Sequence, residues 1–413
     1  MKTEPEAEET LGTVIPLASR PEARPIAASA PVTALASLAR DAGLGAVNIV
    51  GWRDLDDAEA GGSELHAATI ARLWAAAGIA VTMRTSSASG HPAACERDGY
   101  QVVRKAGRYA VFARTPLSHL LGRTARPDGL VEIWNGMPFF SPVWARCARV
   151  VFLHHVHAEM WRMVIRPRAL ARVGEAVEFR LAPPFYRRAR IVTLSESSRQ
   201  EIVDLLGLPE DNVTVVPPGV DPRFSPGGER APRPLVVAVG RLVPVKRFDL
   251  LIEALARLRG RHRGLEAVIV GEGYERRGLE ASLRAAGAER WLHLPGYLSP
   301  SALVDLYRRA WVLASSSARE GWGMTITEAG ACATPSVVTR IAGHLDAVVD
   351  GHSGLLASDL YGLIDGLDAV LSDAALRARL GRGAEEQAAR YTWEATARGT
   401  LEALAAEAVR RHG

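Results

Sequence analysis

Two glutamates stand eight positions apart, on either side of the expected start of a helix. Glu320 comes soon after an apolar segment at 311–314 that predicts a strand, and Glu328 lies within an expected helix at 324–332. Gly323 would let the chain turn tightly into that helix. The first turn of a helix offers backbone N–H donors and partial positive charge, so it can bind an anion. With carboxylates on both sides to accept from hydroxyls, the segment predicts a site for a nucleotide-sugar.

A second group of polar residues follows another expected strand, at 235–239. Arg241 and Lys246 come directly after it, where open α/β sheets bind their ligands. The chain uses Arg for most of its cations, and Lys occurs only at Lys2, Lys105 and Lys246. Lys offers a compact charge and Arg a planar fork, and both suit a diphosphate. A solvated basic loop is the alternative interpretation of this pair.

Length and composition are typical of a large soluble enzyme. The chain has 413 residues, 48% of them hydrophobic, and a net charge of +4, too mild to indicate a nucleic-acid partner. Its three cysteines share no metal-ligand spacing, which favours a reducing, cytoplasmic setting. No apolar run approaches the roughly 20 residues of a membrane span. Residues 1–31 are rich in Ala, Pro and Glu, and we expect them to form a disordered tail.

Apolar segments alternate with helical patterns in two successive series, which predicts two doubly wound Rossmann-like domains facing each other across a cleft. We expect an N-terminal acceptor-side domain at 32–228, a C-terminal donor-binding domain at 229–390, and a final helix at 391–413 that packs back on the first domain. A Pro- and Gly-rich linker separates the two series. The expected strands are 47–52, 79–85, 99–104, 110–114, 130–134, 150–154, 190–194, 213–216, 235–239, 267–270, 291–294, 311–314 and 336–338.

The second half resembles glycosyltransferase family 4, the retaining enzymes of the GT-B fold, whose mark is a Glu, seven residues and a second Glu. The resemblance rests there on Glu320-GWGMTIT-Glu328, Gly240-Arg241 with Lys246, Gly271-Glu272-Gly273, and the segment from Asp350 to Leu356. In the first half it rests on WRD at 52–54, AGGSELHA at 60–67, NGMPFF at 135–140, HHVHAEMW at 154–161 and VTLSESS at 192–198. The resemblance spans residues 46–395.

The resemblance implies a role for each matching residue. Arg241 and Lys246 would hold the donor diphosphate, with backbone amides of Gly323, Met324 and Thr325. Glu328 would accept from the ribose hydroxyls and Glu320 from the donor sugar. Gly61 and Gly62 would let the first domain approach the phosphate, and His155 or His157 would lie beside the transferring sugar. The family retains anomeric configuration, by a front-face route in which the leaving phosphate helps to deprotonate the acceptor hydroxyl.

Several motifs have other interpretations. Gly61 and Gly62 could simply form a turn before a helix. Of His154, His155 and His157, at least one is expected to have a structural role. Ser195-Glu196-Ser197 is better explained as a helix cap than as a catalytic group. The D-x-D pair Asp54 and Asp56 is better explained by solvation than by metal binding, so we expect no metal and no cofactor. The Arg-rich stretch at 161–190 could lie on an anionic membrane surface, although we favour a compositional origin.

The sequence is compatible with three classes of function. A retaining glycosyltransferase, acting on a natural product, a glycan or a lipid, accounts for all the motifs together. A nucleotide-sugar epimerase or hydrolase of the same fold would need an acid–base set on the sugar ring, and its usual motifs are not visible. A non-catalytic nucleotide-sugar-binding protein is the third class. The acceptor contacts are expected in loops at 86–96, 115–127 and 159–184; the nucleotide, the sugar and the oligomeric state stay open.

Overall fold

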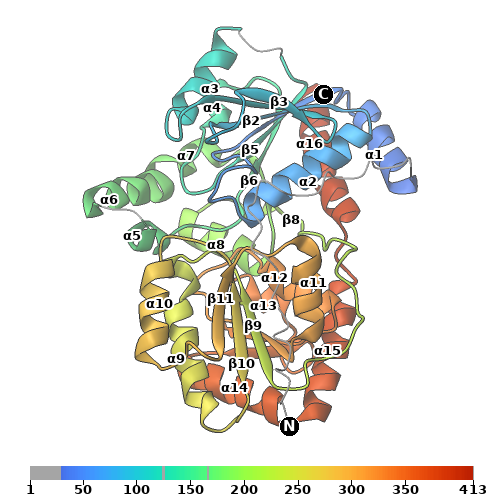
Figure 1. Cartoon of the computed structure of the whole chain (residues 1–413). Helices are drawn as coiled ribbons and strands as arrows, with labels where there is room; N and C mark the ends of the chain where they lie inside the picture. Colours follow the sequence, from blue (N-terminus) through green and yellow to red (C-terminus); the bar gives the residue numbers. More distant parts are fainter. Residues whose placement is uncertain (1–28, 123–125, 165–166, 413) are drawn as a thin grey trace, which may run out of the picture.

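A computed structural model describes residues 29–122, 126–164 and 167–412. The chain forms two α/β halves, one above the other in Figure 1, each built on its own sheet. The predicted tail at 1–31 lies mostly outside the described residues. The predicted end of the tail at residue 31 was wrong, because helix α1 (Ala30–Asp41) already begins at Ala30 and has Pro31 in its first turn. Proline is well accommodated there, since the first N–H groups of a helix have no intrahelical acceptor.

The first sheet has eight strands in the order β3-β4-β2-β1-β5-β6-β7-β8, all parallel except β3, which runs antiparallel to β4. Strands β2 to β4 lie on one side of β1 and strands β5 to β8 on the other, so the strand order reverses between β1 and β5. That reversal is typical of doubly wound sheets. The strands are β1 (Ala46–Val50), β2 (Ala80–Ser86), β3 (Ala94–Arg97), β4 (Tyr100–Ala106), β5 (Gly129–Ile133), β6 (Ala148–Phe152), β7 (Arg190–Thr193) and β8 (Val213–Val215).

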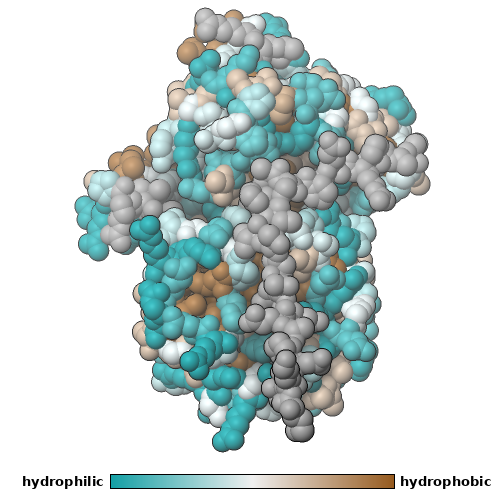
Figure 2. Space-filling view, viewed as in Figure 1, coloured by the Kyte–Doolittle hydropathy of each residue, from teal (hydrophilic) through white to brown (hydrophobic). Residues whose placement is uncertain are grey.

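Helices and shorter turns connect and cover these strands. Beyond α1, they are α2 (Gly62–Ala76), α3 (Val111–Leu120), α4 (Ser141–Trp144), α5 (Met160–Val164), α6 (Arg168–Ala176), the π-helical turn η2 (Val177–Leu181), α7 (Pro183–Tyr186), α8 (Glu196–Leu206) and the 3-10 turn η3 (Glu210–Asn212). Helices α5 and α6 project from the first half (Figure 1), and apolar atoms are exposed on this projection in Figure 2. Leu170 and Val173 are 53% and 54% exposed there.

The second sheet has six strands, in the order β11-β10-β9-β12-β13-β14, with all five pairings parallel. Its reversal lies between β9 and β12. The strands are β9 (Leu235–Val239), β10 (Glu266–Val270), β11 (Leu292–Gly296), β12 (Val312–Ser315), β13 (Ser336–Thr339) and β14 (Gly354–Ala357). The connecting elements are η4 (Pro244–Lys246), α9 (Phe248–Arg259), α10 (Arg276–Ala285), α11 (Pro300–Arg309), α12 (Met324–Ala331), α13 (His344–Ala347), α14 (Leu360–Ser372) and α15 (Ala374–Ala388).

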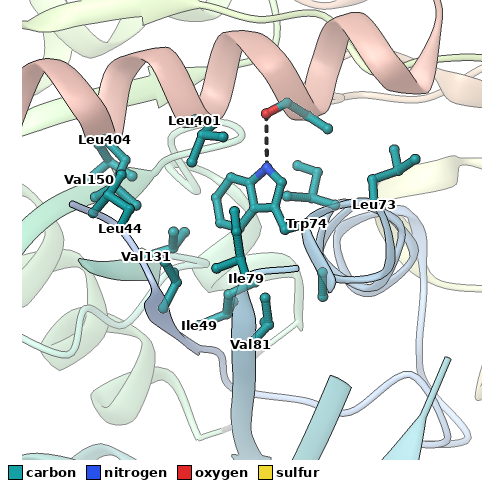
Figure 3. Close-up of a cluster of buried hydrophobic side chains, with 14 of the residues drawn as sticks. Leu44, Ile49, Leu73, Trp74, Ile79, Val81, Val131, Val150, Leu401 and Leu404 are labelled. Atoms are coloured by element: carbon teal, nitrogen blue, oxygen red, sulfur yellow. Dashed lines mark hydrogen bonds between the residues drawn. The ribbon is translucent and has the colours of Figure 1, made fainter. Parts of the chain in front are cut away.

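The last helix, α16 (Trp393–His412), returns to the first half and packs beside α1, α2 and β6. Figure 3 shows Leu401 and Leu404 of this helix in one cluster with Trp74 and with apolar side chains of the first sheet. The indole N–H of Trp74 donates to the backbone carbonyl of Ala397 at 3.0 Å. Both halves are therefore joined by the linker after β8 and again by this returning helix.

Some local predictions were wrong. The segment 110–114, predicted as a strand, belongs to helix α3, whose buried residues Val111 and Thr115 stand four apart as a helix face requires. The predicted acceptor loop at 86–96 contains the start of β3, an edge strand with no fully buried residue. Strand β14 was not predicted at all. In the other predicted strands the observed boundaries differ by at most two residues.

Candidate active site

The loops that follow β9 and β12 meet at the point where the order of the second sheet reverses. The amide of Ala318 donates to the carbonyl of Val245 at 2.8 Å. The hydroxyl of Ser316 donates to the carbonyls of Lys246 and Arg247, at 3.0 and 2.8 Å. These bonds fix the basic loop and the Glu320 loop against each other. Open α/β sheets bind ligands at such a reversal, outside the carboxyl ends of the strands.

Lys246 and Glu320 form an ion pair across these two loops. The Lys246 ammonium donates a short hydrogen bond to Oε1 of Glu320, and Ser317 Oγ donates to the same oxygen at 2.8 Å. Burial alone would raise the pKa of Glu320, but the charges of Lys246 and His344 and the hydrogen bonds from Lys246 and Ser317 together outweigh burial, and the pKa falls to about 2. The carboxylate is therefore ionised at neutral pH.

The basic side chains are less accessible than the sequence suggested. The sequence left open a solvated basic loop, but Arg241 and Lys246 are both half-buried. Burial lowers the pKa of Arg241, and its Nη1 donates a long hydrogen bond of 3.4 Å to the carbonyl of Glu59. The carboxylates of Glu64 and Glu320 are near enough to raise the pKa of Arg241, but Arg241 forms an ion pair with neither of them. Arg241 is thus a half-buried cation whose donors are not saturated by a carboxylate of the described residues.

The glycine pair of the first half lies directly against this basic site. A β-carbon placed on Gly61 would come within 3.3 Å of the Arg241 Nε, and one on Gly62 within 3.1 Å of the Met324 sulfur. A larger residue at either position would therefore require the Arg241 or Met324 side chain to shift. Gly61 and Gly62 begin α2, and the Glu64 carboxylate accepts from the Gly61 amide at 2.7 Å. The start of α2 thus faces the start of α12, and both helix starts favour an anion between them.

Helix α12 begins at a glycine that the backbone requires. Gly323 has φ +96°, and a β-carbon there would meet Ile326 at 2.7 Å. Met324 and Thr325 follow in the first turn and are half-buried. The predicted turn and helix start at this position are therefore present.

Glu328 lies one turn further along α12, apart from the ion pair of Lys246 and Glu320. Its Oε2 accepts from the Tyr307 hydroxyl at 3.2 Å, and burial raises its pKa to about 7. The other charges that act on it are those of Asp221 and Arg223, in the segment between the two sheets. The two glutamates therefore have separate partners, Tyr307 for Glu328 and Lys246 with Ser317 for Glu320.

Two of the histidines after β6 lie beside the Glu320 loop. The rings of His155 and His157 stack with centroids 4.9 Å apart and an interplanar angle of 17°. Burial lowers the pKa of both, that of His155 to about 3, so both are neutral at neutral pH. A β-carbon on Gly321 would lie 3.5 Å from Nδ1 of His155. Neutral imidazoles here can exchange hydrogen bonds with a sugar, but are weak bases.

The third histidine, His154, has a structural partner. Its Nε2 lies 3.2 Å from Nδ1 of His66 on α2, and both rings are buried. This arrangement fits the expectation that at least one histidine of the motif is structural. It also ties the end of β6 to the helix that carries the glycine pair.

Glu178 is a residue that sequence reasoning missed. It is fully buried on the π-helical turn η2 and accepts from the amides of His157 and Ala158, at 2.8 and 3.3 Å, and from the Trp161 indole at 2.7 Å. Burial raises its pKa to about 7. Glu178 holds the histidine segment in place. No local pattern marks it, because its partners lie 17 to 21 positions earlier.

Arginines and a helix cap account for two further motifs of the first half. Asp54 is fully buried and pairs with Arg97 at 2.8 Å, and Asp56 pairs with both Arg97 and Arg104. Solvation was therefore the wrong explanation of the D-x-D motif, which is held by arginines. Ser195 caps α8 by accepting from the amide of Ser198. Within the described ranges, no three His, Cys, Asp or Glu side chains gather as metal ligands would.

Two family models match the chain in succession. The model described as Glycosyltransferase Family 4 matches residues 60–224, and that described as Glycosyl transferases group 1 matches residues 222–387. A D-inositol 3-phosphate glycosyltransferase of Stackebrandtia nassauensis is 37% identical over 236 residues, 50% of this chain and 52% of that protein. The namesake from Acidothermus cellulolyticus is 37% identical over 242 residues, 51% of this chain and 52% of that protein. The chain thus spans about half the length of these curated relatives.

Solved structures share the whole architecture. Sucrose-phosphate synthase from Thermosynechococcus elongatus superposes with a TM-score of 0.74 at 19% identity, covering 86% of this chain and 97% of that one. Anabaena HepE, solved in complex with UDP and glucose, gives 0.68 at 17% identity, covering 87% and 99%. At this identity the likeness establishes the fold, which is GT-B. With the two family models matching from residue 60 to residue 387, the chain belongs to glycosyltransferase family 4.

Proposed function

We propose that this protein is a retaining glycosyltransferase that moves a sugar from a nucleotide-diphosphate sugar to an acceptor hydroxyl. One observation carries the proposal: the unsaturated Arg241 and the Lys246–Glu320 pair lie between two helix starts, with Gly61 and Gly62 close on the other side. Cations and helix amides around one point suit a diphosphate. The neighbouring carboxylate and histidines suit the hydroxyls of a sugar.

The arrangement supports a mechanism by positioning and charge stabilisation. Arg241 and Lys246 would bear the charge that develops on the leaving diphosphate, together with the amides of Gly323 to Thr325. The acceptor hydroxyl would approach on the same face and give its proton to the leaving phosphate. His155 and His157 have lowered pKa values, so they would orient hydroxyls as neutral rings rather than remove the proton.

The named relatives suggest which substrates to test first. Two of them are D-inositol 3-phosphate glycosyltransferases, and the HepE structures contain UDP, glucose or UDP-glucose. We therefore propose UDP-sugars as the first donors and phosphorylated cyclitols as the first acceptors. Glycans, lipids and natural products follow as acceptor classes.

We also propose that the reaction needs no metal, because Arg241 and Lys246 supply the positive charge that a metal would otherwise provide. The three cysteines, Cys95, Cys147 and Cys332, are free, which agrees with a reducing compartment. Among the described helices, none combines the length and the apolar character that crossing a bilayer demands.

An assay of nucleotide release, with and without acceptor and with EDTA throughout, tests the proposal. A transferase releases UDP from a UDP-sugar only when an acceptor is present, with one glycosylated product per UDP. Release without acceptor would instead support the hydrolase alternative, and a changed sugar in the unspent donor would support the epimerase. Binding of nucleotide-sugars without turnover, for every donor and acceptor tested, would support the non-catalytic binding protein.

A further inference from the structure

Arg319, the residue before Glu320, connects the Glu320 loop to the first half. Its Nε donates to the backbone carbonyl of Val156 at 2.6 Å, and its side chain is only 12% exposed. Val156 stands between His155 and His157. A single guanidinium therefore joins the segment that carries Glu320 to the segment that carries both histidines.

The same guanidinium also has two acidic partners on the first half. Its Nη2 lies 2.9 Å from Glu201 Oε1 on α8, and its Nη1 lies 3.4 Å from Glu159 Oε2. Burial raises the pKa of Glu201, and the charge of Arg319 opposes that rise. Glu201 is 23% exposed and Glu159 75%, so Glu201 is the partner that holds Arg319 most firmly.

The residue on the other side of Glu320 is docked as well. A β-carbon on Gly321 would lie 2.5 Å from the carbonyl oxygen of His154, so the two backbones touch. The Ser198 hydroxyl, also on α8, donates to the Gly321 carbonyl at 3.3 Å. Glu320 itself is bound to Lys246 and Ser317 of the second half. Its two neighbours are thus fixed by the first half and its carboxylate by the second.

From these contacts we infer that Arg319 is a positioning residue: it sets the distance of Glu320 from His155 and His157 and so the geometry in which a donor sugar is held. The inference rests on the proposed glycosyl transfer. The ion pairs of Arg319 are with Glu159 and Glu201 of the first half, and neither is a residue of the proposed phosphate site. Loss of Arg319 should therefore leave diphosphate binding intact and damage turnover, because a displacement of about 1 Å can reduce a rate by about 100-fold.

The test compares Arg319→Ala and Arg319→Lys with a matched control, Arg340→Ala. Arg340 makes an exposed ion pair with Asp350 inside the second half, far along the chain from the histidines. We expect Arg319→Ala to lower kcat by about 10- to 100-fold, with donor KM and the Kd for UDP within about twofold of the original. Arg319→Lys should lose less, because an ammonium can keep either Val156 or Glu201 as partner. Arg340→Ala should be unchanged.

Other outcomes would overturn the inference. An unchanged kcat in Arg319→Ala excludes a positioning role, and an equal loss of UDP affinity means that the residue supports the donor site as a whole. Should Arg319→Ala fail to fold, Arg319→Lys must show the loss of kcat with intact UDP binding, or the inference is wrong. Glu201→Gln, which keeps the Val156 contact, should show a smaller loss of kcat than Arg319→Ala.

A measurement that needs no turnover separates this inference from the proposed function. Small-angle X-ray scattering with saturating UDP should give a larger radius of gyration for Arg319→Ala than for the original protein, because the two halves lose the buried ionic contact that joins them beside Glu320. If the original protein transfers no sugar, the proposed function fails, while the scattering result still decides whether Arg319 holds the halves together. Equal radii with UDP bound would refute the contact as a determinant of closure.

Discussion

Lys246 has two possible anionic partners, Glu320 and the diphosphate of a donor. In the structure its ammonium binds Glu320, which keeps the carboxylate ionised and fixes its direction. A diphosphate placed between the starts of α2 and α12 would compete for the same ammonium. The strength of diphosphate binding at this site therefore reflects an exchange of partners at Lys246, whereas Arg241 is paired with no carboxylate in the part of the chain that the structure describes.

The first prediction concerns the two cations. Replacing Arg241 and Lys246 together by Ala should abolish turnover and weaken UDP binding by at least about 100-fold, since two charge-assisted contacts are lost. Both residues are half-buried, so circular dichroism must establish that the double variant is folded. Near-original UDP affinity, measured by calorimetry on folded protein, would contradict the assignment of the phosphate site.

The second prediction separates the two carboxylates. Glu320→Gln should retain UDP affinity or raise it several-fold, because Lys246 loses its competing anion, while kcat falls by about 100-fold. Glu328→Gln should weaken UDP binding, since Glu328 is assigned to the ribose. The comparison is made by calorimetry with UDP and by initial rates. Equal losses of UDP affinity in both variants would mean that the division of roles is wrong.

The third prediction is a pH dependence at Glu328. Its pKa is raised to about 7 by burial, and ribose hydroxyls donate better to its ionised form. UDP binding should therefore favour deprotonation, and affinity should rise as pH increases from 6 to 8. The phosphate of UDP also ionises in this window, so Glu328→Gln is the control. The contribution of Glu328 is the difference between the pH dependence of UDP affinity in the original protein and in Glu328→Gln. If the two pH dependences are equal, Glu328 does not bind the ribose.

Among the elements, those that the sequence predicted best are strands buried on both faces. Strand β9 has the predicted bounds, because Pro234 and Gly240 flank a short run of Leu, Val and Ala that is typical of a central parallel strand. Its neighbour across the sheet reversal, β12, is shifted by one residue. Since ligands bind beyond the ends of such strands, the same pattern located Arg241 and Glu320.

The elements that the sequence missed lie at edges or depend on distant partners. Strand β3 is half exposed and pairs with β4 alone, so it has no apolar run. The sequence at the start of helix α3 is also compatible with a strand. The helical spacing of its buried residues becomes visible only when Thr115 is considered together with Val111. The contacts of Glu178 and Arg319 join residues far apart in the chain, so no local spacing could predict them.

The fourth prediction tests how α16 stabilises the first half. Leu404 is fully buried, and its Cδ2 lies where a β-carbon on Gly129 would come within 2.8 Å. Leu404→Ala should lower the free energy of unfolding by about 2–5 kcal/mol, from lost burial and the cavity left behind. Glu402→Ala on the exposed face of the same helix should change it by less than about 1 kcal/mol. Denaturant unfolding followed by circular dichroism measures both. A small effect at Leu404 would mean that the helix docks weakly.

At the scale of the whole molecule, the site exists only where the two halves meet. Arg241, Lys246 and Glu320 come from the second sheet, and the glycine pair and histidines from the first. Contacts between the halves surround the site: Arg319 reaches Val156, Tyr297 reaches the carbonyl of Ala58, and Asp346 accepts from the amides that begin α8. We therefore expect the halves to close on the donor before reaction, which excludes water from the diphosphate.

The last prediction follows from that shared site and concerns stereochemistry. Inversion needs a general base on the face of the sugar opposite the leaving group. The histidines nearest the site, His155 and His157, have their pKa values lowered by burial and stack on each other, so neither is suited to take a proton. The cations and helix starts instead lie where they stabilise a leaving diphosphate, beside which an acceptor hydroxyl can attack. An α-linked donor should therefore give an α-linked product, read from the anomeric proton coupling by NMR. A β-linked product would refute the front-face mechanism and would assign the base to one of these histidines.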